Sequence, residues 1–162
     1  MDHVELFEIS SLRGSVLAAG LVAMMGGAAT AGECPADQMG VDVTKPGATE
    51  PAGVTDSVLG SIDLGQEMLK AEGRKFRLRQ LVIEPGGVVP WHSHADRPAI
   101  IYIVSGTVEE YASNCAVPIV HKAGDVAPET QATSHWWKNT GSETAVLLSA
   151  DILHDETDAN TM

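Results

Sequence analysis

The chain has few basic residues, and nowhere do they form a block. Lys and Arg number 10 against 22 Asp and Glu, so the 162-residue chain has a formal net charge of −12. Binding to nucleic acid depends on basic side chains that displace counterions from the phosphates. The charge balance therefore predicts that neither nucleic acid nor, for the mature form, a membrane is a partner. Aromatic residues are also too scarce for a base-stacking platform, with two Phe, two Tyr and three Trp.

Cysteine is nearly absent. Cys34 and Cys115 are the two that occur, and neither belongs to a CxxC motif or to a Cys/His metal-binding spacing. In an exported protein such a pair is a candidate disulfide. The alternatives are two unrelated thiols or, least favoured because no partner residue is identifiable, a catalytic nucleophile.

An apolar, uncharged run over residues 16–25 is too short to span a membrane comfortably. Arg13 precedes this run, and Ala29-Thr30-Ala31 follows it as a small-x-small cleavage site. This order is typical of a secretory signal peptide. We therefore expect residues 1–31 to be a signal peptide and the protein to be secreted or periplasmic. The acidic start of the chain is atypical of such a leader, and a buried Ala/Gly-rich helix is the alternative.

Short apolar runs separated by turn residues make up most of the remaining chain. Regular short strands of this kind are typical of a single all-β domain, a sandwich or a barrel. We expect an extended lead-in over 32–57, a barrel over 58–154, a flexible acidic tail over 155–162 and one brief helix over 66–73. The expected strands are Val58–Leu64, Phe76–Ile83, Ala99–Val104, Val108–Ala112, Val117–His121, His135–Trp137 and Thr144–Ile152.

The histidines carry the main chemical signal. His92 and His94 form an HxH pair, and on a strand residues i and i+2 project from the same face. His135 begins another expected strand. Three imidazoles from neighbouring strands would offer a divalent metal ion three nitrogens and leave coordination positions open. The alternative is a group of polar residues at a barrel mouth that binds no metal.

Glycines at fixed distances from these histidines extend the pattern. The two segments are Gly86-GVVPW-His92-Ser-His94-ADRP-Ala99-IIYIVS-Gly106 and Gly124-DVAPETQATS-His135-WWK-Asn139. They resemble the two motifs of the cupin superfamily, which are G(X)5HXH(X)3,4E(X)6G and G(X)5PXG(X)2H(X)3N. The resemblance implies a cupin-type jelly-roll β-barrel with a metal in its lumen, held by the three histidines.

Two departures from the motifs bear on the metal site. Ala99 stands where the first motif has glutamate, and Thr130 and Ala132 stand where the second has proline and glycine. Without the glutamate, the site resembles the three-histidine branch of the superfamily, which includes dioxygenase-like members. Glu129 and Asp96 are candidates to supply a replacement carboxylate ligand, although a loop acid is more often simply solvated.

Two aromatic residues are pocket candidates. Trp137 is in phase with His135 on the expected strand and is placed to line the pocket, although packing in the core is favoured. Tyr102 alternates with Ile101 and Ile103, so the strand period predicts that it points away from the lumen.

Two arginines and a further histidine complete the candidates. Arg77 and Arg79 share a strand face, where they would meet a carboxylate substrate at the barrel mouth or form a solvated edge. The solvated edge is favoured. His121 lies at an expected turn and is predicted to be exposed.

The segment Ala99–Val104 is apolar on both faces and therefore needs cover on both. This pattern predicts a homodimer, and the alternative is an N-terminal segment folded over the barrel.

These features predict an exported metal-binding cupin, most simply a small metalloenzyme of dioxygenase type that acts on a small chelating substrate. Fe(II) is the favoured metal, while Zn, Ni or Mn would favour isomerase or lyase chemistry. A non-catalytic cupin that binds a metal or a small ligand is the alternative, and a scaffold without metal is the third possibility. The sequence identifies no catalytic residue.

Overall fold

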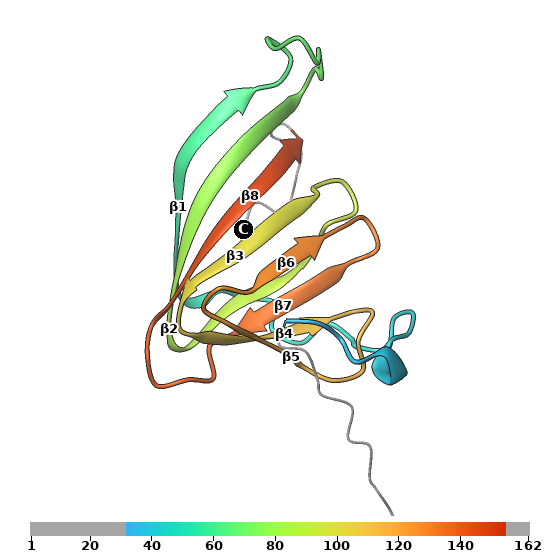
Figure 1. Ribbon diagram of the computed structural model, residues 1–162, viewed down its shortest axis with the longest axis vertical. Helices are drawn as coiled ribbons and strands as arrows, with labels where there is room; N and C mark the ends of the chain where they lie inside the picture. The colour runs from blue at the N-terminus through green and yellow to red at the C-terminus, as the bar shows by residue number, and fades with distance from the viewer. Residues whose placement is uncertain (1–31, 155–162) are drawn as a thin grey trace, which may run out of the picture.

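The computed structural model describes residues 32–154, so the expected signal peptide and acidic tail lie outside the described part of the chain. These residues form a nearly closed barrel of antiparallel strands (Figure 1), which confirms the all-β prediction. One short 3-10 helix, η1 (Ala36–Gln38), precedes the strands. The eight strands are β1 (Ala52–Asp63), β2 (Arg74–Ser93), β3 (Ala99–Ser105), β4 (Thr107–Ala112), β5 (Ile119–Lys122), β6 (Val126–Glu129), β7 (Ser134–Lys138) and β8 (Ala145–His154).

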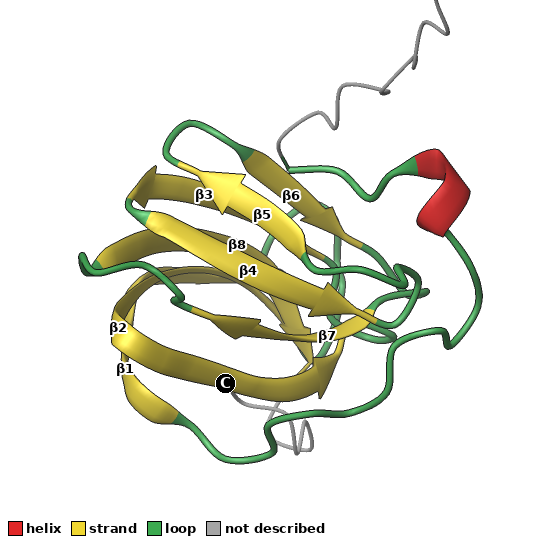
Figure 2. Ribbon diagram, turned by 90° about the horizontal axis from the view of Figure 1, so that it is seen from below, coloured by secondary structure: helices red, strands yellow, loops and turns green. Residues whose placement is uncertain are grey.

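Strand β2 is long enough to belong to both walls of the barrel. Its first half pairs with β1 on one side and with β8 on the other, and its second half pairs with β7. The first wall therefore contains β1, the start of β2, β8, β3 and β6, whereas the second contains the end of β2, β7, β4 and β5. Figure 2 shows β2 curving around the barrel between the two walls.

Glycine permits two of the sharpest changes of direction. Gly86 has a φ of +78° between the two halves of β2, in the left-handed region that residues with a side chain rarely adopt. Gly106 has a φ of +81° in the turn from β3 to β4, and a Cβ there would lie 2.7 Å from the Cα of Ala145. Both residues are the glycines of the HxH motif.

The lumen is divided into an apolar end and a polar end. Strand pairing in the first wall places residues in layers that run from charged to apolar along the barrel: Arg77, Asp151 and Ala99; Arg79, Ser149 and Ile101; Leu81, Leu147 and Ile103. The largest buried apolar residue is Trp137, which packs in the same core cluster as Ile83 and Ile103. The polar end leaves room for a functional site inside an otherwise close-packed barrel.

Several details differ from the predicted elements, among them β2, which was expected to end at Ile83 and runs on to Ser93. Residues 66–73 form turns and no helix, and β1 begins at Ala52, inside the expected lead-in. The strand β6 was not predicted, because it has four residues and contains Pro128, which is tolerated on a sheet edge. No helix among residues 32–154 is long and apolar enough to cross a membrane.

The lead-in is held against the second wall. Cys34 and Cys115 form a disulfide with a Cα–Cα distance of 5.8 Å. The backbone N–H of Val43 donates to Ser113 O at 2.9 Å, and the N–H of Trp91 donates to Ala48 O at 2.7 Å. The lead-in therefore contacts the loop that follows β4 and the end of β2, and Figure 2 shows it passing around this end of the barrel.

The outer face of the first wall has no such cover within the described chain. Ile100, Tyr102 and Val104 on β3 are 57%, 43% and 44% exposed, and Val126 and Phe76 on neighbouring strands are exposed as well. Tyr102 therefore points outward and is no part of the pocket. An apolar sheet face of this kind is typical of an interaction surface.

Candidate metal centre

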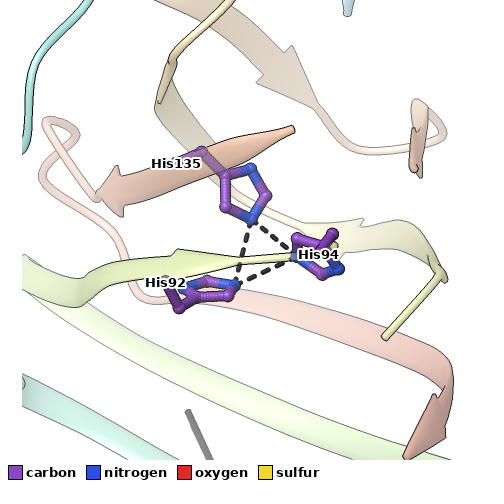
Figure 3. A group of neighbouring side chains, drawn as sticks. All are labelled: His92, His94 and His135. Atoms are coloured by element: carbon purple, nitrogen blue, oxygen red, sulfur yellow. Dashed lines mark hydrogen bonds between the residues drawn. The ribbon is translucent and has the colours of Figure 1, made fainter. Parts of the chain in front are cut away.

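Three imidazoles converge in the lumen. β2 supplies His92 and the adjoining His94, and β7 supplies His135, which pairs directly with His92. The Nε2–Nε2 distances are 3.1 Å between His92 and His94, 3.0 Å between His94 and His135, and 3.0 Å between His135 and His92. Figure 3 shows the three rings pointing toward one another. All three residues are buried.

The hydrogen bonds made by the Nδ1 atoms determine the tautomers of His92 and His94. The Nδ1 of His92 lies 2.8 Å from Pro90 O, and the Nδ1 of His94 lies 2.7 Å from Arg97 O. A carbonyl oxygen accepts only, so each Nδ1 carries the proton and each Nε2 presents a lone pair. These lone pairs face one another and the Nε2 of His135, an arrangement that a bound cation would stabilise.

The triad fits a divalent metal ion. An ion bonded to imidazole at about 2.0–2.1 Å can touch all three Nε2 atoms when these lie 3.0–3.1 Å apart. Burial, with the nearby His135, lowers the pKa of His92 to about 2, and burial likewise lowers the pKa of His94 to about 3. Both rings are therefore neutral at physiological pH, which is the state that binds a metal.

Glu110 holds the third ring and was not identified from the sequence. Its Oε1 accepts from the Nδ1 of His135 at 2.8 Å, and its Oε2 lies 2.8 Å from the Nε2 of His121. Burial alone would raise the pKa of Glu110, but the bonds to His121 and His135 outweigh it and lower that pKa to about 2. His121 is fully buried, so the prediction that it is exposed was wrong. Its alternation with outward residues on β5 is the signal that was available.

Glu129 lies beside the triad without facing its centre. Its carboxylate is 3.5 Å from the Nδ1 of His135, the nitrogen that points away from the other two rings. Burial and the nearby Glu110 raise the pKa of Glu129 to about 7, against the opposing effect of His135. Burial disfavours the charged form of His135, but Glu129 and Glu110 outweigh burial and raise its pKa. Glu129 therefore favours the charged form of His135, from the side of the ring that faces away from the other two imidazoles.

Asp96 lies outside the site. It is exposed, and its carboxylate pairs with Arg74 at 2.5 Å and with His154 at 2.7 Å. These two surface partners hold Asp96 away from the lumen, so it is not placed to be the replacement carboxylate ligand for which it was a candidate. Ala99 pairs with Glu129 on β6 and with Asp151 on β8, so carboxylates flank the position of the absent motif glutamate. Neither faces the three Nε2 atoms.

A narrow pocket opens beside His92 and His94. Its apolar walls come from Leu81, Val89, Ile101, Trp137 and Leu147. Trp137 thus belongs to the hydrophobic core and also lines the pocket. Its Nε1 lies 3.2 Å from the Nδ1 of His135. The free space is about 20 Å³, enough for one or two water-sized groups.

Two buried arginines lie at this end of the barrel, and Arg79 lines the pocket. Arg77 donates to both oxygens of Asp151 at 3.0 and 2.8 Å, and Arg79 contacts the same carboxylate at 3.2 Å and also pairs with Asp56. The prediction of a solvated edge was therefore wrong. The two arginines do share one face of the strand, as the strand period predicts. Their acidic partners, however, lie on other strands and are distant in sequence.

We expect Glu110→Gln to lower metal affinity by about 10- to 100-fold. Residues that orient a metal-bound histidine typically contribute this much, and the amide cannot hold the His135 imidazole as a carboxylate does. Competition titration with a chromophoric chelator measures the change. Glu109→Gln is the matched control, because Glu109 is the neighbouring acid on β4 and bonds Tyr111. Equal affinities in the two variants would contradict the role of Glu110.

The metal-free protein should lose stability when acidified. The pKa values of His92 and His94 fall from 6.5 to about 2 and about 3, so below pH 6.5 the unfolded chain binds protons that the folded chain does not. Each ring then removes about 1.4 kcal/mol per pH unit at most. Chemical denaturation between pH 7 and 4 tests this against His92→Gln/His94→Gln, whose stability should fall less steeply. Parallel curves would show that the two rings do not contribute.

Comparison with known proteins agrees with the geometry. Residues 79–151 match the family model described as the cupin domain. This barrel has the cupin fold. Among curated proteins, the chain is 28% identical over 105 residues to germin-like protein 5-1 of Oryza sativa subsp. japonica, covering 61% of the chain and 48% of that protein. It is 29% identical over 110 residues to germin-like protein subfamily 2 member 2 of Arabidopsis thaliana, covering 64% and 50%. The chain thus spans about half the length of these relatives.

Solved structures share the cupin fold. A protein with a double-stranded β-helix domain from Klebsiella pneumoniae has a TM-score of 0.51 and 20% identity, covering 70% of this chain and 85% of its own. A predicted oxalate decarboxylase from Thermotoga maritima has a TM-score of 0.50 and 23% identity, covering 71% and 97%. At these identities the similarity supports the fold alone.

Proposed function

We propose that this cupin binds one divalent metal ion, Fe(II) in the favoured case, and is an oxidoreductase of dioxygenase type acting on a small chelating substrate. The observation that carries the proposal is the triangle of buried Nε2 atoms beside an apolar pocket. A divalent ion held there would supply Lewis acidity and, as iron, redox activity toward dioxygen. His92, His94 and His135 would hold it.

The other residues of the site support this role through position and charge. Neutral imidazoles donate no charge, so a bound cation would keep its full positive charge. Glu110 keeps a proton on the Nδ1 of His135 and so directs its Nε2 toward the centre. The apolar walls limit water near the open side of the triad. Together these features favour exchangeable ligands at the metal over a closed structural site.

A non-catalytic cupin that captures a metal or small ligand is the second candidate. The observation that favours it is the small free volume of about 20 Å³ beside the histidines. A substrate of more than a few atoms would need the side chains around the pocket to move. Activity with a small substrate would therefore separate the two candidates.

Elemental analysis of the purified, tag-free protein tests the metal site. We expect near-stoichiometric iron in the wild type, its loss in His92→Ala/His94→Ala, and its retention in His154→Ala, which changes an exposed histidine. Iron would justify oxygen-uptake assays with thiol, diketone, phenolic and oxalate substrates. Zinc, nickel or manganese would instead favour non-redox chemistry or metal capture. No metal in the wild type after reconstitution would overturn the proposal.

We also propose that the mature protein is secreted or periplasmic. The disulfide between Cys34 and Cys115 supports this location, because such bonds persist in oxidising compartments. The apolar run and cleavage-type motif before residue 32 support it independently. Mass spectrometry of the protein recovered from a periplasmic or culture fraction tests it, and an intact N-terminus there would count against cleavage.

A homodimer through the outer face of the first wall is the final part of the proposal. The lead-in lies against the second wall, whereas Ile100 and Val104 on the first wall are exposed, which favours a second copy as their cover. We expect Ile100→Lys/Val104→Lys to shift the protein from dimer to monomer in sedimentation velocity, because buried lysines would oppose association. Val41→Lys, on the exposed lead-in, is the control. A monomeric wild type would exclude the dimer.

A further inference from the structure

Arg79 is a buried cation that faces the metal pocket. It lies on the inward face of β2, is 4% exposed, and lines the same pocket as His92 and His94. Besides the two histidines and the indole N–H of Trp137, the polar group in the pocket's described lining is Ser149, which lies 3.5 Å from the guanidinium. A guanidinium remains protonated in proteins, so Arg79 contributes a permanent positive charge to this wall.

The neighbouring acids contact only the two terminal nitrogens of the Arg79 guanidinium. One terminal nitrogen of Arg79 pairs with Asp56, and the other contacts Asp151 at 3.2 Å. The Nε–H is buried and has no hydrogen-bond partner among the described residues. A buried donor without a partner is costly, and a residue that serves only structure usually satisfies it.

Arg77 provides the internal comparison. It lies two residues earlier on the same face of β2, and its Nε and a terminal nitrogen donate to both oxygens of Asp151. Arg77 does not line the pocket beside the histidines. Arg77 and Arg79 thus share the carboxylate of Asp151. Arg79, which lines the pocket, is the arginine whose Nε–H has no partner among the described residues.

The charges around the pocket favour an anion. No carboxylate is among the described residues that line it. Asp56 and Asp151 lie behind the guanidinium, whereas Glu110 and Glu129 lie near the Nδ1 of His135, beyond the triad. With neutral imidazoles around a divalent ion, the pocket would face the ion and a guanidinium whose charge Asp56 and Asp151 balance. An anion there would be attracted by the ion and would accept the hydrogen bond that the Arg79 Nε–H does not make among the described residues.

We propose that Arg79 is the specificity-determining residue of this pocket and that it recognises a small carboxylate substrate. The carboxylate accepts a charge-assisted hydrogen bond from the guanidinium, while Leu81, Ile101 and Leu147 contact the substrate's apolar part. The inference rests on the proposed function, because it assigns the substrate class to the same metal site. Under this inference Arg79 recognises the substrate, whereas Arg77 supports the structure around it.

Acetate and its neutral analogue acetamide are suitable probes, because they have the same shape and differ in charge. Isothermal titration calorimetry is carried out on full-length protein, both metal-loaded and metal-free, for the wild type, Arg79→Gln, and the matched variant Arg77→Gln. We expect Arg79→Gln to weaken acetate binding at least tenfold and leave acetamide binding unchanged. Arg77→Gln should change acetate binding by less than about threefold, because it leaves the pocket wall intact.

Separate readouts distinguish this inference from the metal proposal. Metal content is measured for each variant, and circular dichroism checks the fold. If either glutamine variant does not fold, the corresponding lysine variant replaces it, and Arg79→Lys should still weaken acetate binding severalfold while Arg77→Lys should not. If the wild type binds no metal, the proposed function fails, and the metal-free titration decides the role of Arg79. Absence of acetate binding to the wild type, or equal losses in the Arg79 and Arg77 variants, would overturn the inference.

Discussion

Replacing Asp151 by asparagine is expected to lower the free energy of unfolding by about 3–5 kcal/mol. Asp151 is 1% exposed and is the shared partner of Arg77 and Arg79. Removing one member of a buried ion cluster leaves an uncompensated charge away from water, which costs far more than the loss of a surface pair. Here Arg77 would lose its charged partner and one of its two hydrogen bonds, because the amide nitrogen of asparagine cannot accept. Urea denaturation followed by circular dichroism measures the loss.

Asp96→Asn is the matched control for this variant. Asp96 also contacts two basic residues, Arg74 and His154, but it does so at the surface. Solvent screens such a pair, so we expect no measurable change in stability. A comparable loss in both variants would show that burial of the Asp151 cluster has no special weight.

Removing the disulfide is expected to have an effect of similar size. The bond joins residues 81 positions apart, and in the chain-entropy model closing such a loop stabilises the folded state by about 4 kcal/mol. Cys34→Ser/Cys115→Ser should therefore lower the denaturation midpoint without altering the barrel. The wild type measured in reducing agent should show the same loss. Stability that is unchanged in both cases would indicate that the lead-in contributes little to the native state.

Short-range patterns predicted the all-β fold and the HxH pair, whereas the barrel and the complete histidine triad were implied by the resemblance of two segments to the cupin motifs. Glycines that permit positive φ, such as Gly86 and Gly106, mark turns at fixed distances from the histidines. An HxH pair on a strand must project to one side, whatever the rest of the chain does. His135 could be added because its motif has its own glycine spacing. No long-range contact had to be known for these predictions.

What could not be predicted depends on pairing between strands distant in sequence. Arg77 and Arg79 are buried because β8 places Asp151 beside them and β1 places Asp56 there. His121 is buried because β4 presents Glu110 to it across the β4–β5 pair. In both cases a charged or polar residue in isolation resembles a surface residue. The partner that makes burial possible is identified only by strand register.

The path of β2 through both walls limits how this site can change. The arginines lie before the bend and the histidines lie after it, so one continuous strand sets the separation between substrate recognition and metal binding. Arg79 and His92 lie 13 positions apart and both are buried, so the alternation of side chains is already broken once between them, at the irregularity between Val89 and His92. Inserting or deleting a single residue elsewhere in this segment would turn one of the two groups out of the lumen, unless a second irregularity compensates. The position of one irregularity in one strand thus becomes a heritable constraint on the chemistry of the barrel.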